Sequence, residues 1–110
     1  MIKKLTIPIF HGTLILFQDV EPEKAFAMVN MEHDPDSYFG AISQVCEDRN
    51  GNRAFVIIFD ECDPQAVAHE AVHIAHRIIQ EHGMEGDEEL IAYLTGWVVT
   101  QCHKYLRVEK

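Results

Sequence analysis

The sequence predicts a small α+β domain in which the elements follow one another in the order ββαββαα. Two segments rich in β-forming residues flank Asn50-Gly51, and this dipeptide is the strongest short-range mark of a tight hairpin turn. Asp63-Pro64 has the residue types of a helix N-cap and of a first helical position. A chain of 110 residues fits one core. We therefore expect a single domain over residues 1–110, with a mixed or antiparallel sheet of about four strands.

The first part of the chain is expected to contribute two strands and one helix. Residues 2–10 contain strong β-formers, and Pro8 favours a place at the edge of a sheet. Residues 13–18 form a second run of β-formers, which we expect to pair with the first as a hairpin. Pro22 suits the first position of a helix, and apolar residues then recur at helical spacing to about residue 31.

The second part is expected to contribute two strands and two helices. Residues 38–47 and 53–60 are the predicted strands of the Asn-Gly hairpin, and the second is apolar without alternation, which predicts a central strand covered on both faces. A helix should then run from Pro64 to about His82, with the next residue, a glycine, suited to its C-terminal cap. The acidic run at residues 87–89 should begin the last helix, where negative charge favours the helix dipole.

Composition excludes several classes of function. The formal net charge is −9 and the nine basic residues form no run, so we expect no nucleic-acid partner. The apolar runs are far shorter than the roughly 20 residues that span a bilayer, so we expect no membrane partner. The three cysteines lack any CxxC spacing, which favours free thiols in a reducing compartment. These features predict a cytoplasmic protein and leave its oligomeric state open.

The second predicted helix contains the chain's one chemical motif, the HExxH at His69–His73. Helical positions i and i+4 lie on one face, so the imidazoles of His69 and His73 converge on a point where they can hold Zn²⁺. Glu70 can reach a metal-bound water and accept its proton. The pattern fixes only three positions and also arises by chance in a chain with seven histidines. The hairpin before it and the capped helix favour the zinc site.

Zinc needs a third protein ligand, with the fourth position left to water in a catalytic site. Glu89 shares a predicted helical face with Ala92 and Gly96, whose small side chains let the last helix approach the HExxH helix closely. A symmetric helical hairpin nevertheless puts Glu89 roughly 9 Å from His73 along the axis. Acidic residues in a first turn also favour the helix dipole without any metal, and Glu88 stays an alternative ligand.

Two other side chains lie near the predicted metal. The same helical hairpin places Tyr93 close to it, where the hydroxyl can polarise a carbonyl. His76 continues the row of His69 and His73, but His69 and His76 lie about 10 Å apart along a helix, too far to share one metal. His76 is therefore expected outside the ligand set.

Together these residues resemble the pattern of gluzincin-type metallopeptidases, in which an HExxH helix precedes a helix bearing Glu-x-x-Ala. The last helix here reads Glu89-Leu90-Ile91-Ala92-Tyr93 and is most similar to minimal zincin-like proteins, including small uncharacterised proteins of phage and prophage origin. The resemblance covers about residues 60–100 and implies a zincin-like domain. The chain departs from larger gluzincins in its short connection between the helices and in having no evident second domain. The implied ligands of Zn²⁺ are His69, His73 and Glu89, with Glu70 as general base.

Two functions follow as hypotheses. The first is a zinc-dependent metallopeptidase, in which zinc activates a water, and Glu70 accepts its proton and passes it to the leaving amine. A peptide substrate could then pair with the exposed edge of the strand at residues 39–45. The second is a non-catalytic zinc-binding protein on the same scaffold that binds a host or phage protein, because 110 residues leave little chain for substrate-binding loops. A metal-free domain with incidental histidines is a third reading. The sequence names no substrate.

Overall fold

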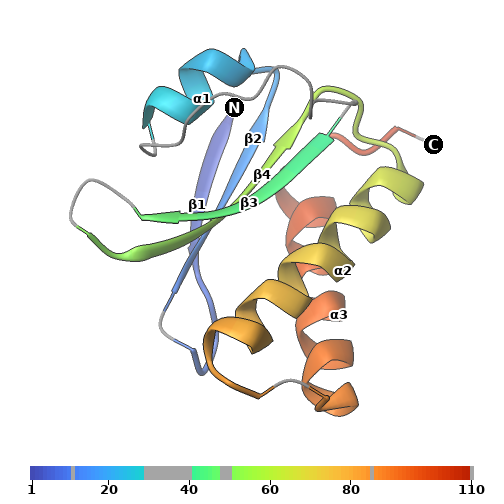
Figure 1. Ribbon diagram of the computed structural model, residues 1–110. Helices are drawn as coiled ribbons and strands as arrows, with labels where there is room; N and C mark the ends of the chain where they lie inside the picture. Colours follow the sequence, from blue (N-terminus) through green and yellow to red (C-terminus); the bar gives the residue numbers. More distant parts are fainter. Residues whose placement is uncertain (11, 29–40, 48–50, 85, 110) are drawn as a thin grey trace.

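The structure is a computed structural model that describes residues 1–10, 12–28, 41–47, 51–84 and 86–109. Its elements follow the predicted order ββαββαα, so the domain is α+β, with three helices and a four-stranded mixed sheet in the described residues (Figure 1). The elements are β1 (Ile2–Thr6), β2 (Thr13–Gln18), α1 (Pro22–Met28), β3 (Ala41–Glu47), β4 (Arg53–Phe59), α2 (Pro64–Glu81) and α3 (Glu88–Tyr105).

The strand order in the sheet is β1-β2-β4-β3. β1 and β2 are antiparallel, β2 and β4 are parallel, and β3 and β4 are antiparallel, as the two predicted hairpins require. The register of the second hairpin ends at the pair Glu47–Arg53. In its turn Gly51 has a φ of 81°, which an L side chain rarely adopts, while Asn50 lies outside the described residues. The central position predicted for β4 is confirmed.

The first strand is shorter than predicted. It ends at Thr6, although its β-forming residues suggested a strand that extends to Phe10. Pro8 cannot donate a backbone hydrogen bond, and the chain turns there. The Ile7 amide donates to the Gly12 carbonyl at 2.9 Å, and the Phe10 amide donates to the Pro8 carbonyl at 2.8 Å. Both bonds close the loop between β1 and β2.

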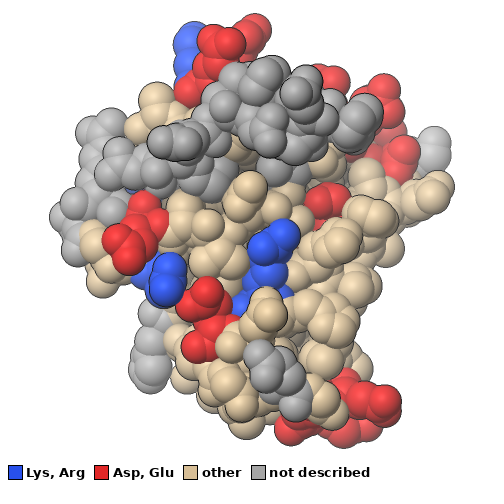
Figure 2. Space-filling model, viewed as in Figure 1, with Lys and Arg blue, Asp and Glu red and all other residues tan. Residues whose placement is uncertain are grey.

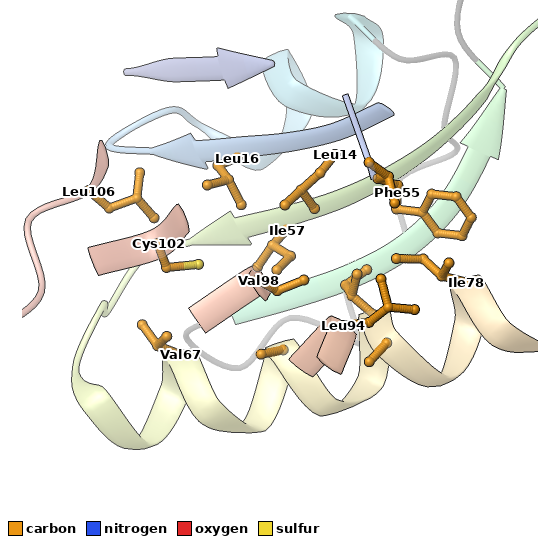
Figure 3. Packing of buried hydrophobic residues seen from close by; sticks show 14 of the residues in the cluster. Leu14, Leu16, Phe55, Ile57, Val67, Ile78, Leu94, Val98, Cys102 and Leu106 are labelled. Atoms are coloured by element: carbon orange, nitrogen blue, oxygen red, sulfur yellow. The ribbon is translucent and has the colours of Figure 1, made fainter. Parts of the chain in front are cut away.

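The sheet is covered on both faces, because successive side chains of a strand point to opposite sides. The larger core lies between the sheet and the pair α2 and α3, and Figure 3 shows side chains from these helices and from β2 and β4 pointing toward one another. The smaller core lies under α1. β4 alternates accordingly. Its side chains toward α2 and α3 are Phe55, Ile57 and Phe59, and those toward α1 are Ala54, Val56 and Ile58.

Both ends of α2 are capped as predicted. The Asp63 carboxylate accepts a hydrogen bond from the Ala66 amide at 2.7 Å, and Pro64 occupies the first helical position. At the other end Gly83 has a φ of 67° and its amide donates to the Gln80 carbonyl at 3.1 Å. The next amide, that of Met84, donates to the Ile79 carbonyl at 3.1 Å, which completes a Schellman motif. The helix that carries the HExxH therefore has firmly defined limits.

The segment after α3 is hydrogen-bonded to β2 and to the residues just before α2. Gln18 is buried and bonds both backbone groups of Arg107: its Nε2 donates to the carbonyl at 2.7 Å, and its Oε1 accepts from the amide at 3.0 Å. Two residues later the Glu109 amide donates to the Cys62 carbonyl at 2.7 Å.

Within the described chain, no helix is both long and apolar enough to cross a membrane.

Candidate functional site

The apolar stripe of α2 determines which of its side chains reach the surface. The helix packs against α3, β3 and β4 (Figure 1). Its buried apolar residues recur at spacings of three and four, as in any helix with one face in a core. They are Val67, Ala71, Ile74, Ala75, Ile78 and Ile79. The histidines of the HExxH lie outside this stripe and are exposed, whereas Glu70 lies within its margin and is buried.

His69 and His73 converge as the i, i+4 spacing predicts. Their Nε2 atoms are 3.2 Å apart, and their ring centroids are 4.7 Å apart in an edge-on arrangement. A tetrahedral zinc ion with Zn–N bonds of about 2.0–2.1 Å would place two ligating nitrogens about 3.3 Å apart. The separation of the two Nε2 atoms therefore suits ligation of one metal ion by both imidazoles. The same distance also suits an N–H···N hydrogen bond between two neutral imidazoles.

Glu70 is one of two buried polar residues among those that the structure describes, with 6% of its surface exposed. Carboxylates are almost never buried unless they have a partner. Its Oε2 lies 4.0 Å from His69 Nε2, beyond the reach of a hydrogen bond. No hydrogen bond with His69 therefore occupies the carboxylate, which lies beside the convergence point of the two imidazoles and can accept a proton there.

The carboxylate lies on the side of α2 that faces the β3–β4 hairpin. At 100° per residue, Glu70, Arg77 and Glu81 fall within about 40° of one another around the helix. Glu81 forms an ion pair with Arg53, the first residue of β4, at 3.1 Å. The whole stripe thus borders β3, which lies at one end of the described strand order and pairs there with β4 alone.

The structure does not bring Glu89 to the histidine pair. Glu88 and Glu89 are exposed in the first turn of α3, whose N-cap Asp87 accepts from the Leu90 amide at 3.1 Å. With α2 ending at residue 81 and α3 beginning at 88, Glu89 lies about 10 Å from His73 along the helical hairpin. In the described ranges, no group of three or more His, Cys, Asp or Glu is arranged to hold a metal ion. A third ligand from Glu89 stays a prediction.

Tyr93 and His76 are both exposed. Tyr93 is on α3 with 48% of its surface accessible, and the described residues give its hydroxyl no contact with the histidine pair. Its role as a carbonyl-polarising group therefore stays a prediction. His76 is exposed on α2, three residues after His73, and its place outside the ligand set stays a prediction.

Sequence reasoning missed two residues of α2 and its cap. Arg77 is half-buried, and its Nε is buried with no hydrogen-bond partner. His82 caps the helix and places both ring nitrogens near carbonyl oxygens: Nδ1 lies 2.8 Å from Ile78 O and Nε2 lies 3.1 Å from Phe10 O. Because Phe10 is 72 residues away in the chain, no local pattern could have indicated this contact.

All three cysteines are buried, and Cys62 and Cys102 form no disulfide in the described part of the chain. Burial raises the pKa of the Cys62 thiol to about 11, with a contribution from the nearby charges of Asp63 and Glu109. Burial likewise raises the pKa of the Cys102 thiol to about 12. Both groups stay protonated at neutral pH, so neither is a ready thiolate ligand for a metal.

Comparisons with known proteins leave the site to be argued from its own geometry. No protein-family model matches the chain, and no curated protein or solved structure is significantly similar to it.

Proposed function

We propose that the protein is a zinc-dependent hydrolase of peptide or amide bonds, with His69 and His73 as metal ligands and Glu70 as general base. The observation that carries the proposal is the pair of Nε2 atoms 3.2 Å apart beside a buried carboxylate. A site that only binds zinc for structure would have no use for that carboxylate. The proposed third ligand is Glu89, which must approach the pair from α3.

Each residue of the motif has a separate task. A bound Zn²⁺ supplies a water of lowered pKa and a Lewis acid for the scissile carbonyl. Glu70 accepts the proton of that water and delivers it to the leaving amine. Burial of Glu70 on α2 restricts the positions that its carboxylate can take and keeps it close to the histidine pair. In this proposal the hydroxyl of Tyr93 polarises the scissile carbonyl.

The outer edge of β3, the last strand in the described order, is the proposed binding place for the peptide. An extended peptide can add to a sheet edge through main-chain hydrogen bonds. β3 runs beside the stripe of α2 that carries Glu70, so a peptide on its outer edge would pass the histidine pair. Such a peptide would bring one of its amide bonds next to the proposed metal, which favours a peptide over a small soluble metabolite as substrate.

A non-catalytic zinc-binding role is the second candidate. The observation in its favour is the openness of the pair, because the His69 side chain is 67% exposed. Active sites usually exclude water from the reacting groups. In this case the protein would present its metal, or the surface around it, to a host or phage protein.

Metal analysis and one carboxylate variant separate these functions. The untagged protein should bind about one zinc per chain at neutral pH, and His69→Ala should lose it. The matched control is His76→Ala, an exposed histidine of the same helix, which should retain zinc. Glu70→Gln should retain zinc and lose all hydrolysis of a peptide mixture that the wild type cleaves. A wild type that takes up no zinc from excess metal would overturn both candidates, and zinc uptake without any cleavage would leave the binding role.

A further inference from the structure

Arg77 holds a hydrogen-bond donor that the described structure leaves unused. Its Nε is the only buried side-chain nitrogen or oxygen there without a hydrogen-bond partner. Buried polar atoms in proteins are nearly always paired, so an exception calls for a reason. The two acidic residues on the same side of α2 have other neighbours: Glu81 forms an ion pair with Arg53, and Glu70 lies near His69. Among the described residues, no carboxylate forms an ion pair with the guanidinium of Arg77.

The position of Arg77 relates it directly to the HExxH. It follows His73 by one helical turn, about 6 Å along the axis, and Glu70 by two turns, about 10 Å. It lies on the same stripe of α2 as Glu70, facing the β3–β4 hairpin. Figure 2 shows basic side chains in the middle of this face, with acidic side chains beside them as well as at the top and bottom of the molecule. The basic residues of α2 and of the described hairpin strands are Arg77 and Arg53.

A guanidinium in this place suits a carboxylate. Its planar fork of N–H donors matches the two oxygens of a carboxylate, and such charge-assisted bonds are about twice as strong as neutral ones. An extended peptide rises about 3.3 Å per residue. A peptide on the edge of β3 with one amide bond at the histidine pair would therefore place a group two or three residues away beside Arg77.

We propose that Arg77 binds a carboxylate of the substrate, so that the protein selects peptides with a negative charge two or three residues from the bond at the histidine pair. The carboxylate comes either from the C-terminus of the peptide or from an acidic side chain. The proposal rests on the proposed function for the identity of that bond. Arg77 is a specificity-determining residue, because it recognises a group remote from the reacting atoms.

Binding of short peptides tests the proposal without turnover. The probes are acetylated tetra-alanine with a free carboxylate, the same peptide as its amide, and an amidated analogue with one glutamate. They are titrated into the zinc-loaded Glu70→Gln protein and into protein treated with EDTA, and the Nε–H resonance of Arg77 is followed by ¹⁵N NMR. We expect this resonance to shift, and the affinity for a carboxylate-bearing peptide to exceed that for the plain amide about tenfold.

Two arginine variants test whether Arg77 is the source of the preference for a carboxylate. Arg77→Gln should bind the three peptides equally, whereas the control Arg53→Gln should keep the preference, because Arg53 is already paired with Glu81. A free-acid preference alone identifies a C-terminal carboxylate, and a glutamate preference identifies an acidic side chain. Equal binding of all three peptides by the wild type, or a preference that survives Arg77→Gln, would overturn the proposal. If the wild type takes up no zinc from excess metal and still shows the preference, the role of Arg77 is upheld and the proposed hydrolase is refuted.

Discussion

The two long helices illustrate different limits of a sequence pattern. α2 and α3 each contain 18 residues, each begins at an aspartate N-cap, and the two pack against each other. In α2 the i, i+4 spacing brings two imidazoles to 3.2 Å. In α3 the same kind of reasoning nominates Glu89, which lies about 10 Å away along the hairpin. Spacing within one helix is fixed by its backbone hydrogen bonds. The offset between two helices depends on the loop and on packing.

The core that both helices share offers the largest expected effect. Ile74 on α2 and Leu94 on α3 are fully buried. Truncating either side chain to alanine should lower the free energy of unfolding by about 2–5 kcal/mol, because each leaves a cavity in the core. Urea denaturation measures the change.

The two truncations, Ile74→Ala and Leu94→Ala, should differ in their effect on zinc affinity. Ile74 is one residue from His73, so Ile74→Ala should also weaken zinc binding, whereas Leu94→Ala should weaken it less. Val72→Ala is the control for α2, because Val72 is exposed. Its stability should change by no more than about 0.5 kcal/mol. Identical zinc affinities in all three variants would contradict the view that packing of α2 holds the pair in place.

The contribution of α3 to the metal is the next contrast. If Glu89 joins the pair, Glu89→Gln should weaken zinc binding by more than about tenfold, since loss of even a partner of a metal ligand costs 10–100-fold. Glu88→Gln is the matched control, because it removes the same charge from the same exposed turn. Competition with a chelating dye measures both. If both variants bind zinc as tightly as the wild type, Glu89 is not a ligand, and the only predicted ligands that remain are the two histidines of α2.

Local chemistry made much of the fold predictable. β2 was predicted with its observed limits, and both caps of α2 were identified from Asp63, Pro64 and Gly83, since each of these features depends on neighbours in the chain. The contacts that escaped prediction join distant segments. The His82 ring lies near the carbonyl of Phe10, 72 residues away, and the burial of the Arg77 Nε depends on how α2 packs in the fold. The end of β1 escaped as well, because its β-forming residues continue past Pro8, where the backbone turns.

The two N-caps test whether α2 is the more firmly held helix. The bond from Ala66 to Asp63 measures 2.7 Å and is partly buried, whereas that from Leu90 to Asp87 measures 3.1 Å and is exposed. Asp63→Ala should therefore cost about 1–2 kcal/mol of unfolding free energy, and Asp87→Ala about 0.5 kcal/mol. Thermal and urea unfolding measure both. A larger loss in Asp87→Ala would reverse the comparison.

The smallest expected effect comes from the thiols beside the two helices. Cys62 precedes α2 and Cys102 lies in α3, and burial raises their pKa values from 9.0 to about 11 and about 12. Above pH 9 the unfolded chain loses these protons while the folded chain keeps them, so the folded state binds more protons. Stability should therefore be unaffected below pH 9 and should fall as the pH rises toward 11 or 12. Urea denaturation under reducing conditions at pH 8 and pH 10 measures the slope.

Lysines and tyrosines also titrate in this range, so the difference between variants isolates the thiols. Cys102→Ala should lose stability less steeply between pH 8 and pH 10 than the wild type does, because it lacks the thiol with the larger shift. Cys62→Ala should show a smaller change in slope. An unchanged slope in Cys102→Ala would mean that the thiol ionises in the folded protein, and so that the core around α3 admits charge or water more readily than its packing indicates.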